Sequence, residues 1–508
     1  MKTFSNLTEL LSVGDPTAAA LAAPGRLPLT FEQLRTQVAN TITALNQAGI
    51  GRGDRVAIVL PNGPEMASAF ISVAAGATAA PLSPAYRAEE FEFYLTDLNA
   101  KALVVASNDD SAARTVAKRL NVPVIELLAE GDGAAGSFSL QAGEGALTNP
   151  SNCGGATSDD IALILHTSGT TSRPKIVPLT QRNVCASARN VRDTLHFSAD
   201  DRGLNIMPLF HIHGLIAGLL APLAAGSQVN CTPGFNALKF FSWMTAAKPT
   251  WYSAVPTMHQ TILSRAANHA EAIAANPLRF IRSSSASLPP QVLLELERVF
   301  NCPVIESYGM TEAAHQMSSN PLPSAKRIPG SVGIAAGPEL AIMDDAGKLL
   351  PAQSVGEIVI RGENVTLGYE NNPKANSEAF TNGWFRTGDQ GVLNAEGYLT
   401  LTGRLKEIIN RGGEKISPRE VDDVLMDHPA VQQVITFAMP HDKLGEDVAA
   451  AVVLRQGVSA TEKELREFVA RRLADFKVPR KILFLDEIPK GATGKLQRIG
   501  LAAKLGLG

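Results

Sequence analysis

Cysteine is scarce in this sequence, and its four copies make neither a CxxC pair nor a disulfide pattern. Their wide spacing, at Cys153, Cys185, Cys231 and Cys302, favours a reducing compartment. Long apolar runs are also missing, since no window reaches the roughly 18 apolar residues of a membrane span. The N-terminus lacks the continuous apolar stretch of a signal peptide. We therefore expect a cytoplasmic protein with no membrane partner.

Neither sign of charge dominates the chain. Its 46 basic and 49 acidic residues give a net charge of -3, which excludes the basic footprint of a nucleic-acid-binding protein. A hydrophobic content of 45% in 508 residues is enough for several packed domains. Any anion that the protein binds must therefore be held by donors and cations of its own binding site, not by an overall positive charge.

The common nucleoside-triphosphate loop is absent as well, because nothing matches Gly, four residues, Gly-Lys and then Ser or Thr. GATGKL at 491–496 is a near miss, with Pro489 in place of the first Gly and Leu496 in place of the hydroxyl.

A different phosphate-binding candidate lies at Thr167–Lys175, TSGTTSRPK. Its small residues allow close backbone approach to a ligand, and its hydroxyls and cations suit negatively charged oxygen. A solvated surface turn is the alternative.

The run at 160–166 predicts a buried strand, and the pattern at 179–195 predicts a helix with Thr180 near its cap. We expect the loop to join that strand directly to that helix.

The distribution of apolar residues predicts an α/β fold with a large N-terminal domain and a small C-terminal one. Strand and helix patterns alternate through most of residues 1–403, and short strands with Gly-rich turns mark a β-rich subdomain between 330 and 402. There NAEG separates two strand-like runs of a hairpin. A charged, Gly-containing stretch follows Gly403, and residues 404–508 have their own strand and helix signals, which predicts a hinge and a small α+β domain.

Taken together, six motifs are more specific than any one of them. They occur in the order TSGTTSRPK at 167–175, PLFHIHG at 208–214, SYGMTE at 307–312, WFRTGD at 384–389, GRLKEIINRGGEKISP at 403–418 and PKGATGKLQR at 489–498. With these motifs the chain resembles the acyl-adenylate-forming superfamily of acyl-CoA synthetases, luciferases and adenylation domains, over nearly its whole length.

The resemblance implies that a carboxylate attacks the α-phosphorus of ATP to give an acyl-adenylate and pyrophosphate, and that a thiol then takes the acyl group. Because charge develops on phosphoryl oxygens, cations, donors and Mg²⁺ are expected to drive the reaction. The residues with implied catalytic roles are Lys495, Thr311, Glu312 and His211, and Glu312 would also bind Mg²⁺. The residues implied to bind the nucleotide are Thr167, Ser168, Gly169, Thr170, Thr171, Lys175, Ser285, Ala286, Ser287, Glu306, Tyr308, Gly309, Asp389 and Arg404.

Within that set, the loop at 167–175 would bind the β- and γ-phosphates, Tyr308 would stack on adenine, and Asp389 with Arg404 would bind the ribose. Lys495 would lie between the substrate carboxylate and the α-phosphate. Each has a structural alternative: a turn residue for Asp389, a linker charge for Arg404, a helix-start carboxylate for Glu312 and a core position for Tyr308.

The resemblance also implies that the C-terminal domain is mobile and rotates between the two half-reactions, with its hinge at Lys406. The acceptor implied by the resemblance is coenzyme A. RGGEK at 411–415 would line the pantetheine channel, with Gly412 and Gly413 allowing close approach of the backbone; an ordinary Gly turn is the alternative. The chain ends shortly after Lys495, which leaves no room for a carrier domain and favours free CoA.

The acid is indicated by the residues after SYGMTE. Together with RSSSASL at 282–288 and WYSAVPT at 251–257, AAHQ at 313–316 resembles the oxalate-CoA ligase branch. A second carboxylate needs donors when it is buried, and Ser285, His315 and His211 are the implied substrate contacts. Arg282 and His213 could equally be structural, as could His315, and the spacing of HIHG does not favour a metal site.

Other functions remain open at this point. A ligase for malonate or another short acid is one, a separate adenylation module that loads a carrier protein is a second, and a silent nucleotide-binding protein is a third.

Overall fold

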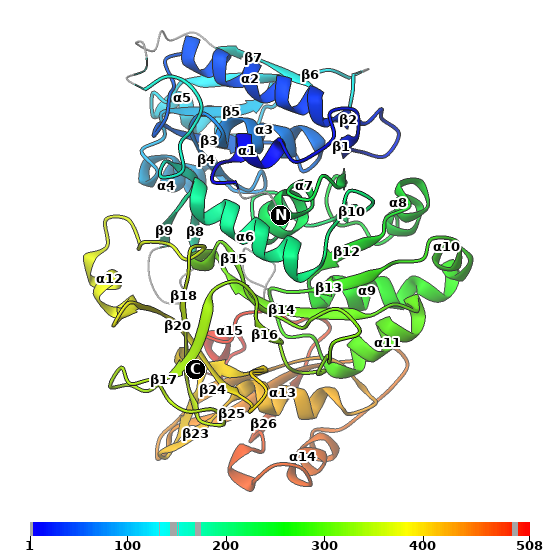
Figure 1. Cartoon of the computed structure of the whole chain (residues 1–508). Helices are drawn as coiled ribbons and strands as arrows, with labels where there is room; N and C mark the ends of the chain where they lie inside the picture. Colours follow the sequence, from blue (N-terminus) through cyan, green and yellow to red (C-terminus); the bar gives the residue numbers. More distant parts are fainter. Residues whose placement is uncertain are drawn as a thin grey trace. The chain divides into compact units, whose positions relative to one another are not determined.

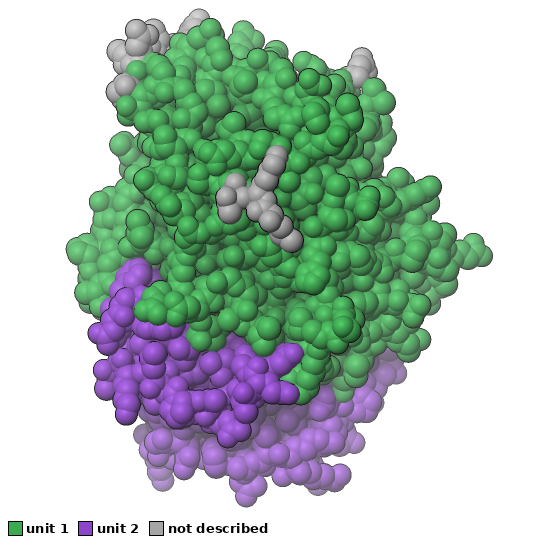
Figure 2. Space-filling model, viewed as in Figure 1, with its two compact units in different colours: residues 1–167, 175–340, 360–379 green, residues 168–174, 341–359, 380–508 purple. Residues whose placement is uncertain are grey.

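The chain forms two compact units, shown in separate colours in Figure 2. The computed structural model describes residues 4–131, 133–142, 150, 152–167, 174–489 and 496–507. Unit 1 comprises residues 1–167, 175–340 and 360–379, and unit 2 comprises residues 168–174, 341–359 and 380–508. The expected division into 1–403 and 404–508 stays a prediction.

Unit 1 is built on two mainly parallel sheets. In its described part, the first has nine strands, in the order β16 (Ile334–Ala335), β15 (His315–Ser319), β14 (Val304–Met310), β13 (Phe280–Ser283), β12 (Trp251–Ala254), β10 (Arg202–Asn205), β11 (Gln228–Cys231), β1 (Ala19–Ala22) and β2 (Leu29–Thr30). The strands from β14 to β1 run parallel. All residues of β12 and β13 are buried, as is typical of parallel strands covered on both faces.

The second sheet has, within the same described ranges, the order β7 (Phe138–Ala142), β6 (Val124–Ala129), β5 (Ala102–Ala106), β3 (Arg55–Val59), β4 (Thr78–Pro81), β8 (Ile161–Thr167) and β9 (Lys175–Thr180). The prediction that the loop after Thr167 leads directly into a helix is wrong. Residues 175–180 instead form β9, which pairs antiparallel with β8 so that Lys175 lies opposite Thr167. Pro178 is tolerated because β9 is an edge strand.

Two helices contact both sheets (Figure 1). Helix α3 (Pro64–Ala74) touches β3, β4 and β8 of the second sheet and β11 of the first, and Glu65 is its one position that is not buried. A helix with small and apolar residues all round is suited to such a position. Helix α6 (Gln181–Thr194) touches β8, β9 and β15. Thr180 caps it in a capping box with Asn183, which confirms the helix predicted there.

The remaining helices of unit 1 lie between its strands along the chain. They are α1 (Leu7–Leu11), α2 (Phe31–Gln47), α4 (Ala88–Asp97), α5 (Ala112–Arg119), the π-helix η1 (His213–Leu220), α7 (Ala221–Leu223), α8 (Phe240–Ala247), α9 (Pro256–Ala266), α10 (Ala270–Ala275), α11 (Pro290–Phe300) and α12 (Pro373–Ala379). The run β12, α9, β13, α11 follows the strand and helix alternation that the sequence predicts there. Tyr252, Ile262, Ile281 and Leu296 from these elements share one apolar core.

Unit 2 is richer in antiparallel strands. Its first sheet has the order β17 (Glu339–Met343), β18 (Val355–Arg361), β20 (Trp384–Leu393) and β19 (Phe380–Thr381), with β21 (Leu399–Arg404) also paired to β20. Its second has β23 (Glu414–Ile416), β22 (Ile409–Arg411), β25 (Gly445–Leu454) and β24 (Val431–His441), with β26 (Lys481–Phe484) beside β25. The helices are α13 (Pro418–Met426), α14 (Glu462–Ala470) and α15 (Leu501–Lys504).

The hairpin predicted around NAEG is confirmed as β20 and β21, and the expected α/β fold class is confirmed as well.

Within the described ranges, none of the helices combines the length and the apolar character that crossing a membrane requires.

The position of α3 between two sheets predicts that its core residues are sensitive to truncation. Phe70 is fully buried there. Because its neighbours lie in packed sheets, we expect Phe70→Ala to lower the free energy of unfolding by about 3–5 kcal/mol, measured by urea denaturation with circular dichroism. Leu238→Ala is the control, since Leu238 is 68% exposed and its truncation should change the free energy by less than about 0.5 kcal/mol. Equal effects of the two changes would contradict this account of α3.

Candidate functional site

A cluster of polar side chains, all buried except the half-buried Ser285, lies in unit 1 at the carboxyl ends of β12 and β13. Ser253 comes from β12, Arg282 from β13 and Ser285 from the turn that follows β13. His213, the first residue of η1, and His315, the first residue of β15, complete the cluster. The carboxyl ends of parallel strands are where open α/β sheets bind their ligands.

His213 lies at the centre of this cluster and is only 2% exposed. Its Nδ1 is 3.0 Å from the Ser285 hydroxyl oxygen, and its Nε2 is 2.6 Å from the Ser253 hydroxyl oxygen. The His213 ring stacks on His315, with centroids 5.0 Å apart and planes 18° apart. Sequence analysis could not distinguish His213 from a structural histidine, because these partners come from distant parts of the chain.

Arg282 is the charged member of the cluster and is completely buried. Its Nη1 is 3.4 Å from His213 Nε2, and its Nη2 donates to the Gln316 side-chain oxygen at 3.3 Å. Across the described part of the chain no carboxylate pairs with this guanidinium, and its Nε has no hydrogen-bond partner. Burial lowers the pKa of Arg282 to about 9, so the group still carries its charge at neutral pH. A buried cation without a counter-ion is costly, which makes the cluster suited to an anionic ligand.

The backbone around the cluster is strained. Ser285, Ala314 and His315 have φ angles of 73°, 46° and 106°. For residues other than glycine, such conformations cost of order 1–3 kcal/mol each and gather at functional sites. The strain therefore supports a functional role for the turn after β13 and for the turn that leads into β15.

Gly309 permits the close approach of β14 and β15. The pairing of these strands is irregular between Tyr308 and Gly309. A Cβ atom on Gly309 would lie 1.6 Å from the carbonyl oxygen of His315. Only glycine therefore allows His315 to occupy its place in the cluster.

A second group of predicted residues meets at Tyr369. The Tyr369 hydroxyl donates to Glu312 Oε1 at 2.8 Å, and Lys175 Nζ lies 4.3 Å from the centre of the Tyr369 ring. Burial, together with the negative charge of Glu312, raises the pKa of Tyr369 well above its usual value. Glu312 is buried, and its carbonyl oxygen accepts the backbone N–H of Thr366 at 2.7 Å. Tyr369 was missed by the sequence analysis because no local pattern marks it.

The other predicted residues of unit 1 surround these two groups. Thr167 ends β8, Glu306 and Tyr308 are buried in β14, and Thr311 begins a short 3-10 turn. Ala286 is exposed, whereas Ser287 is half-buried. The His211 ring packs against Phe210, with centroids 4.6 Å apart. Its predicted catalytic role, like the others, stays a prediction.

Several predicted residues lie outside the described part of the chain. They are Ser168, Gly169, Thr170, Thr171 and Lys495. Elsewhere, over the ranges that the structure describes, no three His, Cys, Asp or Glu side chains gather in a way that would hold a metal ion by themselves.

In unit 2 the two predicted ribose residues are neighbours. Asp389 and Arg404 lie opposite each other on β20 and β21, and Arg404 Nε donates to Asp389 Oδ1 at 3.1 Å. The Arg404 side chain is 56% exposed, so this ion pair stabilises the fold little and Arg404 remains accessible to a ligand, whereas the Asp389 side chain is only 10% exposed.

The predicted glycine pair forms a tight hairpin in the same unit. Gly412 and Gly413 connect β22 to β23 with φ angles of 59° and 99°, as a two-residue hairpin turn requires. Space around a Cβ at Gly413 is open. The ordinary-turn alternative is therefore a sufficient structural reason for both glycines.

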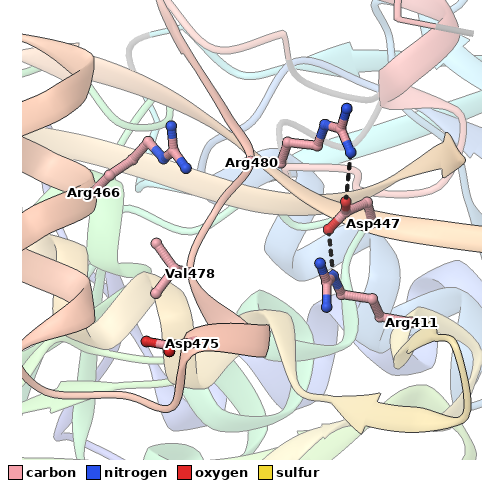
Figure 3. Close-up of a pocket in the computed structure, with 6 residues that line it drawn as sticks. All are labelled: Arg411, Asp447, Arg466, Asp475, Val478 and Arg480. Carbon is pink, nitrogen blue, oxygen red and sulfur yellow. Dashed lines mark hydrogen bonds and ion pairs between the residues drawn. The ribbon is translucent and has the colours of Figure 1, made fainter. Parts of the chain in front are cut away.

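A polar cavity of about 470 Å³ lies beside this hairpin. Figure 3 shows the residues that line it, which are Arg411, Asp447, Arg466, Asp475, Val478 and Arg480. Arg411 Nε donates to Asp447 Oδ1 at 2.7 Å, and Arg480 Nη1 lies 3.6 Å from Asp447 Oδ2. Arg466 has no protein acceptor among the described residues. The cavity thus offers guanidinium groups in excess of its carboxylates.

Comparisons with known proteins agree over nearly the full length. The sequence model of the family described as AMP-binding enzyme matches residues 13–370, and that of the AMP-binding enzyme C-terminal domain matches residues 420–495. An oxalate–CoA ligase of Arabidopsis thaliana is 45% identical over 501 residues, which cover 98% of this chain and 97% of that protein. An oxalate–CoA ligase of Saccharomyces cerevisiae is 43% identical over 473 residues, covering 88% and 86%. The solved structure of ATP-bound MatB from Rhodopseudomonas palustris has 28% identity and a TM-score of 0.87, with 98% of each chain covered.

The close contact between Gly309 and the His315 carbonyl predicts that a larger residue at position 309 destabilises the protein. We expect Gly309→Ala to lower the free energy of unfolding by about 1–3 kcal/mol, because the added methyl group overlaps the His315 carbonyl and β15 must shift. Thermal unfolding followed by circular dichroism measures the effect. Gly131→Ala is the control, since a Cβ there meets nothing within 4 Å. Wild-type stability of Gly309→Ala would show that β15 moves freely.

Proposed function

Because the chain belongs to the AMP-binding enzyme family, we propose that it is an acid–CoA ligase that forms oxalyl-CoA from oxalate, ATP and CoA through an oxalyl-adenylate. Membership confirms the family predicted from the six ordered motifs. The full-length similarity to two oxalate–CoA ligases supports the activity and disfavours the carrier-loading and silent alternatives.

The observation that carries the choice of oxalate is the buried, cationic and donor-rich cluster around Arg282. An aromatic or fatty acid needs an apolar pocket, whereas oxalate brings a second carboxylate that must exchange its water for protein donors. Arg282 has no carboxylate partner in the described part of the chain, and Ser285 and His315 lie within the same cluster. A small dianion would compensate the charge of Arg282.

For the first half-reaction, Lys495 would offset the repulsion between the substrate carboxylate and the α-phosphate, and Thr311 would donate to that phosphate. The loop at 167–175, with Lys175 at its end, would bind the outer phosphates. Tyr308 would stack on adenine. Asp389 would accept the ribose hydroxyls beside Arg404, which agrees with their adjacent places on β20 and β21.

Glu312 would hold Mg²⁺, and its surroundings fit that role. It is a buried carboxylate that accepts from the Tyr369 hydroxyl, and Lys175 Nζ lies over the face of the tyrosine ring. Mg²⁺ is usually bound through one or two carboxylates together with waters and substrate phosphates, so a single carboxylate is sufficient. Bound there, the ion would neutralise charge on the phosphoryl oxygens.

For the second half-reaction, Gly412 and Gly413 would line the pantetheine channel, and the cavity beside them would receive a phosphate of CoA. Guanidinium groups bind phosphate bidentately, and Arg466 lines that cavity without a protein acceptor in the described ranges. We also propose a cytoplasmic location, which rests on the cysteine pattern of the sequence.

The test of the function is a substrate panel. Pyrophosphate release with Mg-ATP and CoA is measured for oxalate, malonate, acetate, glycolate and 4-coumarate. We expect oxalate to exceed each other acid by about tenfold or more in kcat/KM, which is about 1.4 kcal/mol of transition-state preference. A higher value for malonate or acetate would overturn the substrate but not the family, and pyrophosphate release without CoA-dependent AMP formation would instead favour carrier loading.

The CoA site has its own test. Arg466→Gln is expected to raise the KM for CoA about tenfold, as the loss of one charged hydrogen bond predicts, while the KM for 3'-dephospho-CoA stays unchanged. Steady-state kinetics with both thiols measure the difference. Arg455→Gln removes the same charge from an exposed position of unit 2 and is the control. An equal rise for both thiols, or none for either, would exclude the 3'-phosphate from this cavity.

A further inference from the structure

Arg282 contacts His213 in a way that fixes where the imidazole carries its proton. Arg282 is a donor only, and its Nη1 lies 3.4 Å from His213 Nε2. A protonated Nε2 would direct one N–H toward another. The arrangement is favourable only when Nε2 is unprotonated and accepts.

The Ser253 hydroxyl is compatible with that protonation state. It lies 2.6 Å from the same Nε2 and can donate to it, because a hydroxyl rotates to donate or accept. Both neighbours of Nε2 then act as donors. A neutral imidazole with an accepting Nε2 must carry its proton on Nδ1.

The proton on Nδ1 in turn orients Ser285. Nδ1 is 3.0 Å from the Ser285 hydroxyl oxygen, which therefore accepts from His213. The Ser285 hydroxyl has no other hydrogen-bond partner in the described part of the chain, so its own proton is available to a ligand. Ser285 occupies its strained backbone conformation at this point, with φ of 73°.

We propose that Arg282 is a positioning residue that holds His213 as the Nδ1-protonated tautomer, so that the Ser285 hydroxyl donates to a carboxylate oxygen of the acid substrate. The relay runs from Arg282 through His213 to Ser285. The role of Ser285 toward the acid rests on the proposed function, whereas the tautomer of His213 does not.

The other groups at His213 are consistent with the relay. His315 stacks on the ring face, whereas Ser285, Ser253 and Arg282 approach the ring nitrogens. Gln316 fixes the second arm of the guanidinium by accepting from Nη2 at 3.3 Å. Arg282 thus has its orientation set before any substrate binds.

The tautomer is tested in the wild-type protein without substrate. Nitrogen NMR of protein labelled with ¹⁵N-histidine distinguishes protonated from unprotonated ring nitrogens, and His213→Gln identifies the signals of His213 by their loss. We expect a protonated Nδ1 and an unprotonated Nε2. A protonated Nε2 in the wild type would overturn the proposal, whatever the enzyme's substrate.

The consequence for the acid is tested with a pair of variants. Arg282→Met keeps much of the volume but removes the donor, and it should raise the KM for oxalate about tenfold while the KM for ATP is unchanged, as the loss of one charged hydrogen bond predicts. Arg282→Lys keeps a charged donor and should recover most of the oxalate affinity. Equal changes in both KM values, or no recovery in Arg282→Lys, would reduce Arg282 to a packing role.

Failure of the two proposals is distinguishable. If the wild type shows the expected tautomer but prefers another acid, the proposed substrate is wrong and the relay stands for that acid instead. If oxalate is preferred but Nε2 is protonated, the substrate stands and the relay is wrong.

Discussion

The burial of Arg282 without a carboxylate partner is the constraint on which the polar interior of unit 1 depends. A guanidinium in this position must be surrounded by acceptors that carry no charge, and it is: one imidazole nitrogen and one side-chain amide oxygen contact it. The cluster therefore keeps a net positive charge inside the protein. This electrostatic imbalance distinguishes the interior from an ordinary buried ion pair, in which the charge would already be cancelled.

The paired strands of the sheet stabilise the strained backbone of this cluster. Ser285, Ala314 and His315 adopt backbone conformations that an isolated turn would leave. Ser285 lies two residues after β13, Ala314 directly precedes β15 and His315 begins it, and the pairing of both strands is fixed. Gly309 removes the one methyl group that would separate β14 from β15. Small deviations in the backbone thus place two histidine rings in contact, and the sheet holds them there.

Much of the fold was predictable because its signals are local. The apolar periodicity at 179–195, the alternation from β12 to α11 and the turn residues of NAEG each depend on near neighbours in sequence, and each was confirmed. The strand β9 was missed because six residues with a proline resemble a loop until β8 pairs with them. Tyr369 was missed, and His213 and Arg282 could not be told from structural residues, for a similar reason: their partners lie on strands and turns far away in the chain.

The pairing of β1 with β11 has a consequence for biosynthesis. Leu21 lies opposite Val229, so the first strand of the chain leaves the ribosome long before the strand that it joins. All residues of the second sheet, whose last strand ends at Thr180, are synthesised in that interval. Non-local parallel pairing of this kind is slow and leaves apolar edges exposed in the nascent chain. Residues 19–22 therefore cannot join this sheet until residues 228–231 have been made, and until then β1 and β2 lack their neighbour in the sheet.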